Sequence, residues 1–282
     1  MGTLFVVATP IGNLDDITPR AIETLREVAL IAAEDTRHTA KLLRRFEIAT
    51  PTMSLHQHNE RQRSGRVLAA LAEGDVALVT DAGTPAVSDP GAVTVRAVRE
   101  AGHRVVPIPG ASALVSAVSA SGLVDGPFLF AGFLPRSGEE RRTALGGVVA
   151  AGVPVVLFES PNRLAGTLGD LETWLGDVDA VVARELTKLH EEIRGGRLST
   201  LRERFGSGEV KGEVVIVVSA AERGDPAEAS DVTALASRLL ADGMKPSRAA
   251  RELAKIAGIP SEEAYEIVRS APKGETPNPE RS

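Results

Sequence analysis

Short apolar runs alternate with amphipathic segments along most of the chain. In the first half, the apolar runs predict buried strands at Leu4–Ala8, Leu30–Ala33, Thr52–Leu55, Val76–Val79 and Val105–Ile108. Between the strands, the spacing of apolar residues predicts helices after Pro19, around Leu42 and over Arg61–Glu73, Gly91–Ala101 and Ala113–Ala120. Strands that alternate with helices of this length predict a mostly parallel, doubly wound sheet.

The second half continues this alternation after a short break. The segment Ser121–Pro127 contains mainly small residues, glycines and a proline, so it is the best candidate for a linker. Beyond it we predict strands at Phe128–Ala131, Val155–Phe158, Ala180–Ala183 and Val214–Val218, and helices at Glu139–Ala150, Leu164–Leu175 and Leu198–Phe205. The predicted fold class is therefore α/β, with two doubly wound α/β lobes at residues 1–120 and 127–220 and a cleft between them.

A different pattern begins after residue 220. The polar segment Ala221–Ala229 predicts a second linker, and residues 230–270 predict a small all-α domain of short helices. Pro246 opens one helix, Gly258 closes it, and Ser261 caps the next. Helices joined by a glycine-containing turn fit a helix-turn-helix, but few aromatic and basic residues favour a cap packed on the main body. The tail, residues 271–282, is rich in proline and predicted to be disordered.

Composition excludes several classes of protein. The chain has 282 residues, a net charge of −6 and no cysteine, which excludes disulfides, thiol nucleophiles and cysteine-ligated metals. Only two histidines, His56 and His58, lie close together, and such a pair in a loop is seldom a metal site, so we predict no metal. The acidic balance argues against general affinity for nucleic-acid backbones but allows a local basic groove. We expect a soluble, cytoplasmic protein, because neither a secretory signal nor an apolar run of about 18 residues is present.

The stretch Val76–Gly91 carries the strongest single indication of a site. An apolar strand changes abruptly into small residues, prolines and the polar groups of Asp81 and Thr84. Loops at the carboxyl ends of strands are where open α/β sheets bind ligands. An ordinary loop explains the stretch equally well, with Asp89 as the N-cap and Pro90 as the first residue of the next helix. Glycine-rich dinucleotide and P-loop fingerprints are absent, as is the G-x-S-x-G motif of hydrolases.

Acidic and basic residues occur together after several predicted strands. One such cluster is usually a helix cap or a surface ion pair, whereas four at strand ends would converge on one cleft and favour a polar substrate. The four are Glu34-Asp35-Arg37, Asn59-Glu60-Arg61, Glu159 with Arg163, and Arg184-Glu185-Lys188. Basic residues near them could contact phosphates, although each alone is more often on a solvated face: Lys41, Arg44, Arg45, Arg63, Arg66, Arg136, Arg141, Arg142, Arg194 and Arg197.

Two segments resemble the cofactor loops of a known superfamily. Asp81–Gly91 and Val106–Ser112 are similar to the loops with which tetrapyrrole methylases hold S-adenosylmethionine (SAM). Further motifs resemble, in the same order, the bacterial family of ribosomal RNA small-subunit methyltransferase I: Thr9–Leu14, Ala33–Arg37, His58–Glu60, Phe158–Arg163 and Ala183–Lys188. The resemblance covers residues 3 to about 220 and, more diffusely, the helical C-terminus. The sequence Asp-Ala-Gly-Thr-Pro resembles this RNA-modifying branch, where C-methylating members resemble Gly-Gly-Asp-Pro.

The resemblance implies a SAM-dependent enzyme that methylates the ribose 2′-hydroxyl of a decoding-site cytidine in 16S rRNA of the small ribosomal subunit. It also implies a homodimer. Asp35 or Glu185 would accept the proton, and Arg37, Asn59 and Lys188 would orient ribose and phosphate, in a reaction that needs no metal. The residues implied to hold the cofactor are Pro10, Asp81, Ala82, Gly83, Thr84, Val87, Ser112, Ala113, Phe158 and Ala183.

Two other functions remain open on the sequence. A tetrapyrrole C-methyltransferase would use the same arginines for its substrate's carboxylates, but a large flat macrocycle favours more aromatic lining than 3% of the residues supplies. A non-catalytic nucleic-acid-binding protein would use the C-terminal helices, which the net charge of −6 disfavours.

Overall fold

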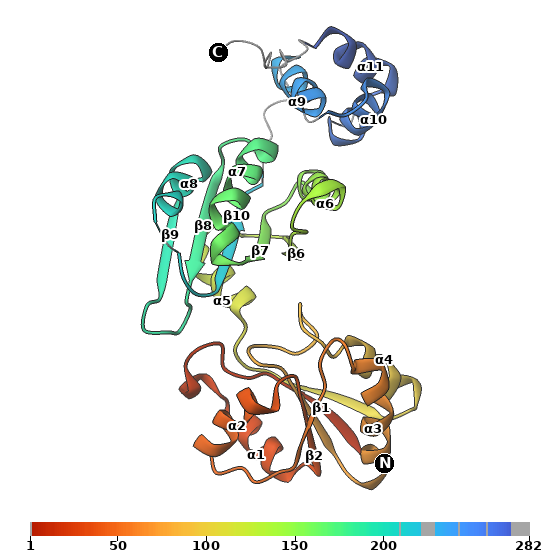
Figure 1. Cartoon of the computed structure of the whole chain (residues 1–282), viewed down its shortest axis with the longest axis vertical. Helices are drawn as coiled ribbons and strands as arrows, with labels where there is room; N and C mark the ends of the chain where they lie inside the picture. Colours follow the sequence, from red (N-terminus) through yellow and green to blue (C-terminus); the bar gives the residue numbers. More distant parts are fainter. Residues whose placement is uncertain (1, 209, 221–228, 242, 258, 272–282) are drawn as a thin grey trace, which may run out of the picture.

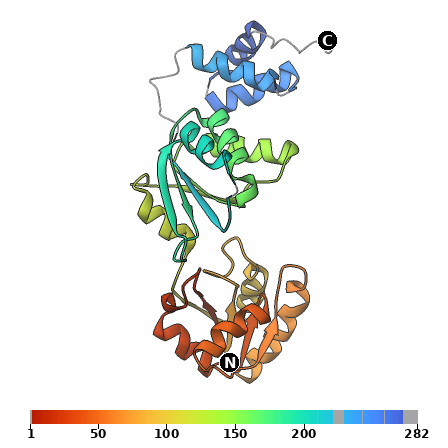
Figure 2. The ribbon, with the colours of Figure 1, turned by 60° about the vertical axis from the view of Figure 1, so that its left-hand side comes forward.

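The chain, in a computed structural model, forms two α/β lobes and a small helical domain (Figure 1). In both views the N-terminal lobe and the helical domain lie at opposite ends of the molecule (Figure 2). The structure describes residues 2–208, 210–220, 229–241, 243–257 and 259–271. Residues 221–228 of the predicted linker 221–229, the helix end at Gly258 and residues 272–282 of the predicted tail 271–282 lie outside these residues.

The N-terminal lobe is built on a parallel five-stranded sheet in the order β3-β2-β4-β1-β5. Helices α1 and α2 cover one face around Leu25, and α3 and α4 cover the other around Leu71. The predicted doubly wound sheet is therefore confirmed. The elements are β1 (Thr3–Val7), η1 (Leu14–Asp16), α1 (Pro19–Glu27), β2 (Leu30–Ala33), α2 (Thr36–Arg45), β3 (Thr52–Ser54), α3 (Glu60–Glu73), β4 (Val76–Val79), α4 (Ala92–Glu100) and β5 (Arg104–Ile108).

The second lobe is also α/β, but its sheet is mixed. In the order β6-β7-β10-β8-β9, only β6 and β7 pair in parallel among the described strands, and the other neighbours are antiparallel. Helices α6, α7 and α8 cover one face with a leucine-rich core. The elements are β6 (Leu129–Phe133), α6 (Gly138–Ala151), β7 (Val155–Glu159), η2 (Pro161–Arg163), α7 (Leu164–Leu175), β8 (Asp179–Arg184), β9 (Glu192–Arg197), α8 (Leu198–Gly206) and β10 (Val214–Val218).

The strand β9 was not predicted. Its sequence, Glu-Ile-Arg-Gly-Gly-Arg, has no apolar run, and it lies at the edge of the sheet, where one side of the strand needs no partner. Antiparallel pairing with β8 places it, with Ala183 opposite Ile193 and Asp179 opposite Arg197. Its place in the sheet depends on pairing with the preceding strand, which the residue pattern of β9 alone does not predict.

Helix α5 (Ala113–Ser121) links the two lobes. It follows β5 of the first sheet, yet its buried Ala117 packs with Val156, Val181 and Val215 on the face of the second sheet that α6 to α8 leave open. Figure 1 shows α5 lying beside this sheet rather than among the helices of the N-terminal lobe. The helix lies within the predicted first domain, 1–120, but its contacts belong to the second lobe.

The helices α9 (Ala229–Ala241), α10 (Pro246–Ala257) and α11 (Ser261–Ser270) form their own core around Leu253. Pro246 opens α10 as predicted, whereas Ser261 is the first residue of α11 rather than its cap. The small domain contacts the main body through Trp174, which packs against both cores, and through the carbonyl of Thr173, which accepts a hydrogen bond of 2.7 Å from Arg238. None of the described helices is long and apolar enough to span a membrane.

Candidate functional site

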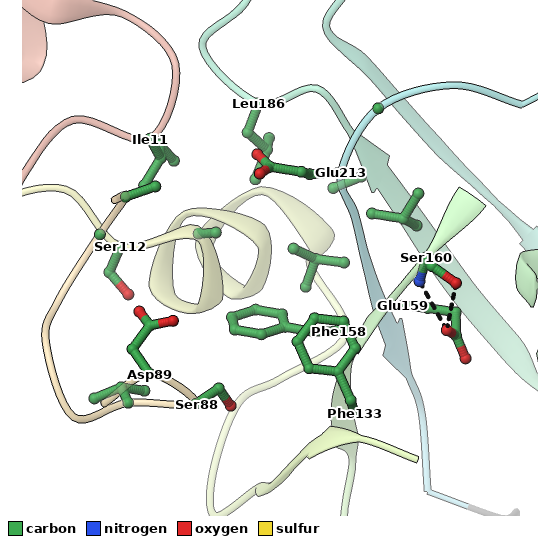
Figure 3. Close-up of a pocket in the computed structure, with 18 of the residues that line it drawn as sticks. Ile11, Ser88, Asp89, Ser112, Phe133, Phe158, Glu159, Ser160, Leu186 and Glu213 are labelled. Atoms are coloured by element: carbon green, nitrogen blue, oxygen red, sulfur yellow. Dashed lines mark hydrogen bonds between the residues drawn. The ribbon is translucent and has the colours of Figure 1, made fainter. Parts of the chain in front are cut away.

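A cavity of about 350 Å³ lies where loops of the two lobes meet (Figure 3). The N-terminal lobe contributes the loop after β4 and the start of α5, and the second lobe contributes the ends of β6, β7 and β8 and the start of β10. A volume of this size is typical of sites for small organic ligands. Many of the predicted cofactor residues line it, namely Ala82, Gly83, Thr84, Val87, Ser112, Ala113, Phe158 and Ala183.

The loop after β4 reaches the cavity in a strained conformation. Ala86 and Ser88 have φ angles of 68° and 63°, in the left-handed region that residues with a side chain rarely adopt. Gly91 has a φ of 134°, and a side chain there would come within 2.9 Å of Leu78 Cδ2. Such strain persists only where surrounding contacts fix the backbone, and it concentrates at ligand sites.

A buried carboxylate from another segment fixes the end of this loop. Glu60 is 7% exposed, and its Oε1 accepts hydrogen bonds from the amides of Gly91 at 3.0 Å and Thr94 at 2.9 Å. Glu60 therefore caps α4 in place of a residue next to the helix. The prediction that Asp89 is the N-cap is wrong, since Gly91 occupies that position and Asp89 instead lines the cavity.

Two predicted cofactor residues face away from this cavity. Thr9 and Gly83 form a short antiparallel bridge, with N···O distances of 2.9 and 3.0 Å between their backbones. Ile11, Ala82 and Gly83 line the main cavity, whereas Pro10 and Asp81 line a separate cavity of about 230 Å³ together with His38, Thr39 and Lys41 of α2 and Thr9, Leu14, Leu42 and Thr80.

Ionic contacts of the second lobe form part of the rim. The Nζ of Lys188 lies 2.8 Å from Glu185 Oε1 and 2.9 Å from Glu213 Oε2. Glu185 has a positive φ of 51°, and its Oε1 also accepts from the amide of Glu213 at 3.0 Å. The hydrogen bond from Lys188 lowers the pKa of Glu185. Glu185 and Lys188 are therefore brought together, and Leu186 and Glu213 beside them line the cavity.

None of the five predicted catalytic residues lines the cavity itself, and Asp35, Arg37 and Asn59 belong to the N-terminal lobe. Asp35 is the N-cap of α2, and its side chain accepts from the amide and the guanidinium of Arg37. The hydrogen bonds from Arg37 lower the pKa of Asp35. Asn59 accepts from the amide of His56 at 2.9 Å and thereby closes the turn before α3. The amide of Asp35 donates to Asp81 Oδ1 at 3.2 Å, which connects Asp35 to the second cavity.

The acidic and basic residues after β7 hold the second lobe together. The Oε2 of Glu159, which is 3% exposed, accepts from Thr167 at 2.6 Å and lies 3.3 Å from Arg163. Arg163 also donates to the carbonyl of Leu134 at 2.8 Å. Arg141, one of the basic residues considered for phosphate contacts, already forms an ion pair within the lobe, because its Nε lies 2.7 Å from Asp170 Oδ2. Of the four clusters predicted to converge on one cleft, the one at Glu159 lines this cavity, whereas the charged residues of the Glu34, Glu60 and Glu185 clusters do not.

Several lining residues were not among the predicted site residues. They are Ile11, Ser88, Asp89, Phe133, Glu159, Ser160, Pro161, Leu186, Gly212, Glu213, Val214 and Val215. Phe133 and Phe158 pack edge to face with 5.7 Å between ring centroids, and Phe133 is 57% exposed. Seven of these residues, among them Ile11, Asp89 and Leu186, lie inside a quoted motif, so the motifs themselves were the available signal. The start of β10 was predicted only as a strand.

Negative charge gathers on the N-terminal side of the cavity. Burial and, after it, the nearby carboxylate of Glu34 raise the pKa of Asp89 to about 6. Burial also raises the pKa of Glu34 itself. In Figure 3 the Asp89 carboxylate points into the cavity towards Ser112 and the ring of Phe158.

These features fit SAM, the cofactor that the resemblance implies. SAM carries a sulfonium, an ammonium and a flat adenine ring. The cavity offers carboxylates for the cationic part, the rings of Phe133 and Phe158 for the flat part, and backbone turns at Gly83 and Gly212 that allow close approach. The residues that would hold it are therefore those of the loop after β4, the start of α5 and the β7, β8 and β10 ends. Within the described residues, no group of three or more His, Asp or Glu side chains could hold a metal ion.

Comparison with known proteins defines the class. A sequence model of the Tetrapyrrole (Corrin/Porphyrin) Methylases matches residues 3–202. The cobalt precorrin-4 methyltransferase structure superposes with a TM-score of 0.59 at 16% identity, covering 77% of this chain and 94% of that one. The uroporphyrin-III C-methyltransferase of Thermus thermophilus in complex with S-adenosylhomocysteine gives 0.56 at 17% identity, covering 79% and 99%. At such low identity these structures establish the fold alone. The chain belongs to the tetrapyrrole methylase family.

Curated relatives are more similar and define a branch of that family. The chain is 45% identical over 271 residues to ribosomal RNA small subunit methyltransferase I of Synechocystis, covering 95% of this chain and 97% of the relative. The protein of the same name from Xylella fastidiosa is 46% identical over 268 residues, covering 94% and 98%. The matches extend over both lobes and the helical domain, so the branch is the one that the motifs resembled.

Proposed function

We propose that the chain is a SAM-dependent methyltransferase of 16S rRNA in the small ribosomal subunit, with the ribose 2′-hydroxyl of a decoding-site cytidine as acceptor. The observation that carries the proposal is the cavity between the lobes. Its lining contains most of the residues that the resemblance assigns to the cofactor, including Gly83 and Phe158. The curated relatives are named as rRNA methyltransferases, and they match almost the whole chain.

Bound SAM supplies an activated methyl group, and transfer to an oxygen is an in-line displacement that requires alignment rather than further activation of the donor. The strained loop after β4 and the aromatic pair fit this task, because they form a fixed, largely apolar wall. In this proposal the RNA strand approaches the cavity past the rim formed by Glu185, Lys188 and Glu213, of which Glu213 lines the cavity.

A ribose hydroxyl is a weak nucleophile, so the site needs either a base or a cation that favours the alkoxide. Of the two carboxylates predicted as proton acceptors, we retain Glu185, whose neighbour Leu186 lines the cavity, and we give Asp35 a structural role at α2. The lowered pKa of Glu185 makes it a weak base. In this proposal Lys188 assists by stabilising negative charge on the ribose oxygen. Arg37, whose side chain is 89% exposed, and Asn59 are proposed to contact the RNA beyond the cavity.

The first experiment incubates the protein with radiolabelled SAM and small ribosomal subunits that lack the modification. Label should enter 16S rRNA and make one linkage resistant to alkaline cleavage, because a methylated 2′-oxygen cannot attack the neighbouring phosphate. An acceptor with 2′-deoxyribose at the target position should receive none. Label in a porphyrinogen instead would support a tetrapyrrole methyltransferase, and binding of RNA without transfer would support a non-catalytic protein. Either result would refute the proposal.

Variants then test the residues at the rim. Glu185→Gln should lower kcat with little change in KM for SAM, whereas Asp179→Asn at the opposite end of β8 should be neutral. Full activity of Glu185→Gln would remove Glu185 from the mechanism. We also propose a cytoplasmic homodimer, as the resemblance implies, and light scattering of the purified protein would measure its mass in solution.

A further inference from the structure

The cavity between the lobes is lined by three carboxylates and by no lysine, arginine or histidine of the described chain. Two of the carboxylates are already compensated. Glu159 is held by Thr167, Ser160 and Arg163, and Glu213 lies 2.9 Å from Lys188. The third, Asp89, forms an ion pair with no basic residue of the described chain. Its negative charge is the one that the protein leaves for a ligand.

The backbone holds Asp89 in this position. Its local role as helix cap is taken by Glu60, whose carboxylate binds the amides of Gly91 and Thr94. The residue before it, Ser88, has a left-handed φ of 63°, which turns the loop into the cavity. The Glu60 cap leaves the Asp89 side chain without a role in α4, and the turn at Ser88 places it at the cavity.

Carboxylates from three neighbouring elements act on Asp89, and the last of them, Glu213, is itself paired with Lys188. They are Glu34 after β2, Asp81 after β4 and Glu213 before β10. Together with burial they oppose ionisation, so that Asp89 has a pKa of about 6 in the cofactor-free protein. A cation in the cavity would offset this repulsion, whereas a neutral group would not.

SAM and its product differ in one charge at one atom. The sulfur of SAM is a sulfonium. When the methyl carbon bonds to the acceptor oxygen, the carbon–sulfur bond breaks and its electron pair stays on sulfur, which becomes a neutral thioether in S-adenosylhomocysteine. The acceptor proton leaves separately. A carboxylate beside the sulfur thus attracts the substrate more strongly than the product.

We propose that Asp89 is a specificity-determining residue that faces the sulfonium and makes the cavity prefer SAM to S-adenosylhomocysteine. The inference rests on the proposed function and extends it to product release. Methyl transfer removes the charge that Asp89 binds, so the spent cofactor leaves a cavity in which carboxylate repulsion has returned. Because only ionised Asp89 discriminates, the preference grows as the pH rises through the range near 6.

The test is isothermal titration calorimetry of the full-length protein with SAM and with S-adenosylhomocysteine between pH 5 and pH 8. For the wild type we expect the ratio of the two dissociation constants to change about tenfold in favour of SAM across this range, the effect of about one pKa unit. Asp89→Asn, which preserves the shape of the side chain, should bind both ligands with a ratio independent of pH. The matched control Asp179→Asn, exposed at the far end of β8, should behave as the wild type.

The outcomes separate the two proposals. If the wild type binds both ligands with a ratio that does not change with pH, the inference about Asp89 is wrong and the proposed function survives. The same holds if Asp89→Asn keeps the wild-type pH dependence or weakens both ligands equally. If the wild type binds neither ligand at any pH, the proposed function fails and the inference falls with it. The measurement on the wild type decides the question even if the variant does not fold.

Discussion

The two lobes differ in the direction of their carboxylate pKa shifts. Both upward shifts among the described carboxylates lie in the N-terminal lobe, which also contains the Arg37-paired Asp35, whereas the carboxylate shifts of the second lobe are downward. In the N-terminal lobe, burial and mutual repulsion raise the pKa values of Glu34 and Asp89. In the second lobe, a hydrogen bond from Lys188 lowers the pKa of Glu185, and hydrogen bonds led by that from Arg194 lower the pKa of Glu192 to about 2. Both sets lie near strand ends, and the sequence pattern alone does not distinguish them.

The difference separates structural charge from charge available to a ligand. A carboxylate that a neighbouring cation neutralises contributes to the fold and has little capacity to recognise another cation. Uncompensated carboxylates destabilise the ligand-free protein and are stabilised when a cation binds. Perturbed pKa values of this kind therefore point to the N-terminal side of the cavity as the part that recognises the cationic donor.

The largest effect is expected from Glu60, on which the position of the N-terminal loop depends. Glu60→Ala leaves the buried amides of Gly91 and Thr94 without their acceptor, and should lower the free energy of unfolding by about 2 to 4 kcal/mol. Glu60→Gln retains an acceptor oxygen and should recover much of this loss. Urea unfolding of the two variants measures it. An equal loss in both would show that the charge of Glu60, rather than its hydrogen bonds, supports the loop.

A smaller effect is expected from the second lobe, where the charges are paired. Lys188→Ala removes the partner of Glu185 and Glu213 and should cost about 1 to 2 kcal/mol at neutral pH. The loss should diminish as pH falls, because protonation of Glu185, whose pKa the hydrogen bond from Lys188 lowers, removes an ionic partner of the cation. Lys188→Arg, which keeps the charge, is the control. Unchanged stability of Lys188→Ala would contradict the view that this rim is held by ion pairs.

Asp89→Asn should have the opposite sign and stabilise the ligand-free protein. The pKa of Asp89 rises from 3.8 to about 6 on folding, so the folded state binds the proton more tightly and the free energy of unfolding falls as pH increases over this interval. Discounted for the solvent that reaches this half-buried side chain, the gain on substitution is about 1 kcal/mol above pH 7. Below pH 3.8 it should vanish. Thermal unfolding at several pH values measures the trend, and destabilisation at pH 8 would contradict it.

The smallest effect is expected from Asp35, a partly exposed cap paired with Arg37. Asp35→Asn keeps an oxygen that can accept from the amide of Arg37, so Tm should change by less than about 2 °C. SAM affinity should remain at the wild-type value, because Asp35 does not line the cavity. A large loss of SAM affinity would show that Asp35 contributes to the cofactor site and would contradict the proposed difference between the lobes.

Local pattern was sufficient for most of the fold. The apolar runs at Leu30–Ala33 and Val214–Val218 are strands with the predicted bounds, because burial of a strand on both faces leaves a continuous hydrophobic signature. The mixed pairing of the second sheet and the edge strand β9 were not predictable in this way, since strand direction depends on long-range pairing. The spacing of apolar residues also does not predict that α5 packs on the second sheet rather than on the first.

The site, like the fold, was predictable from the sequence only in part. Motif resemblance located Gly83, Ser112 and Phe158 at the cavity, but it could not tell which neighbours face inward. Pro10 and Asp81 line a second cavity, and nothing in the local pattern distinguishes them from their neighbours Ile11 and Ala82, which line the main one. Asp89 was predicted as a helix cap because that is its usual role before proline. The competing cap, Glu60, is distant in sequence and becomes evident only in three dimensions.

The most direct test of the central claim is a crystal structure of the protein with S-adenosylhomocysteine. We predict density for the ligand between the loop after β4 and the β7 and β8 ends, in contact with Gly83 and Phe158 and with its sulfur facing Asp89. Density at another place on the protein, with this cavity unchanged, would contradict the account.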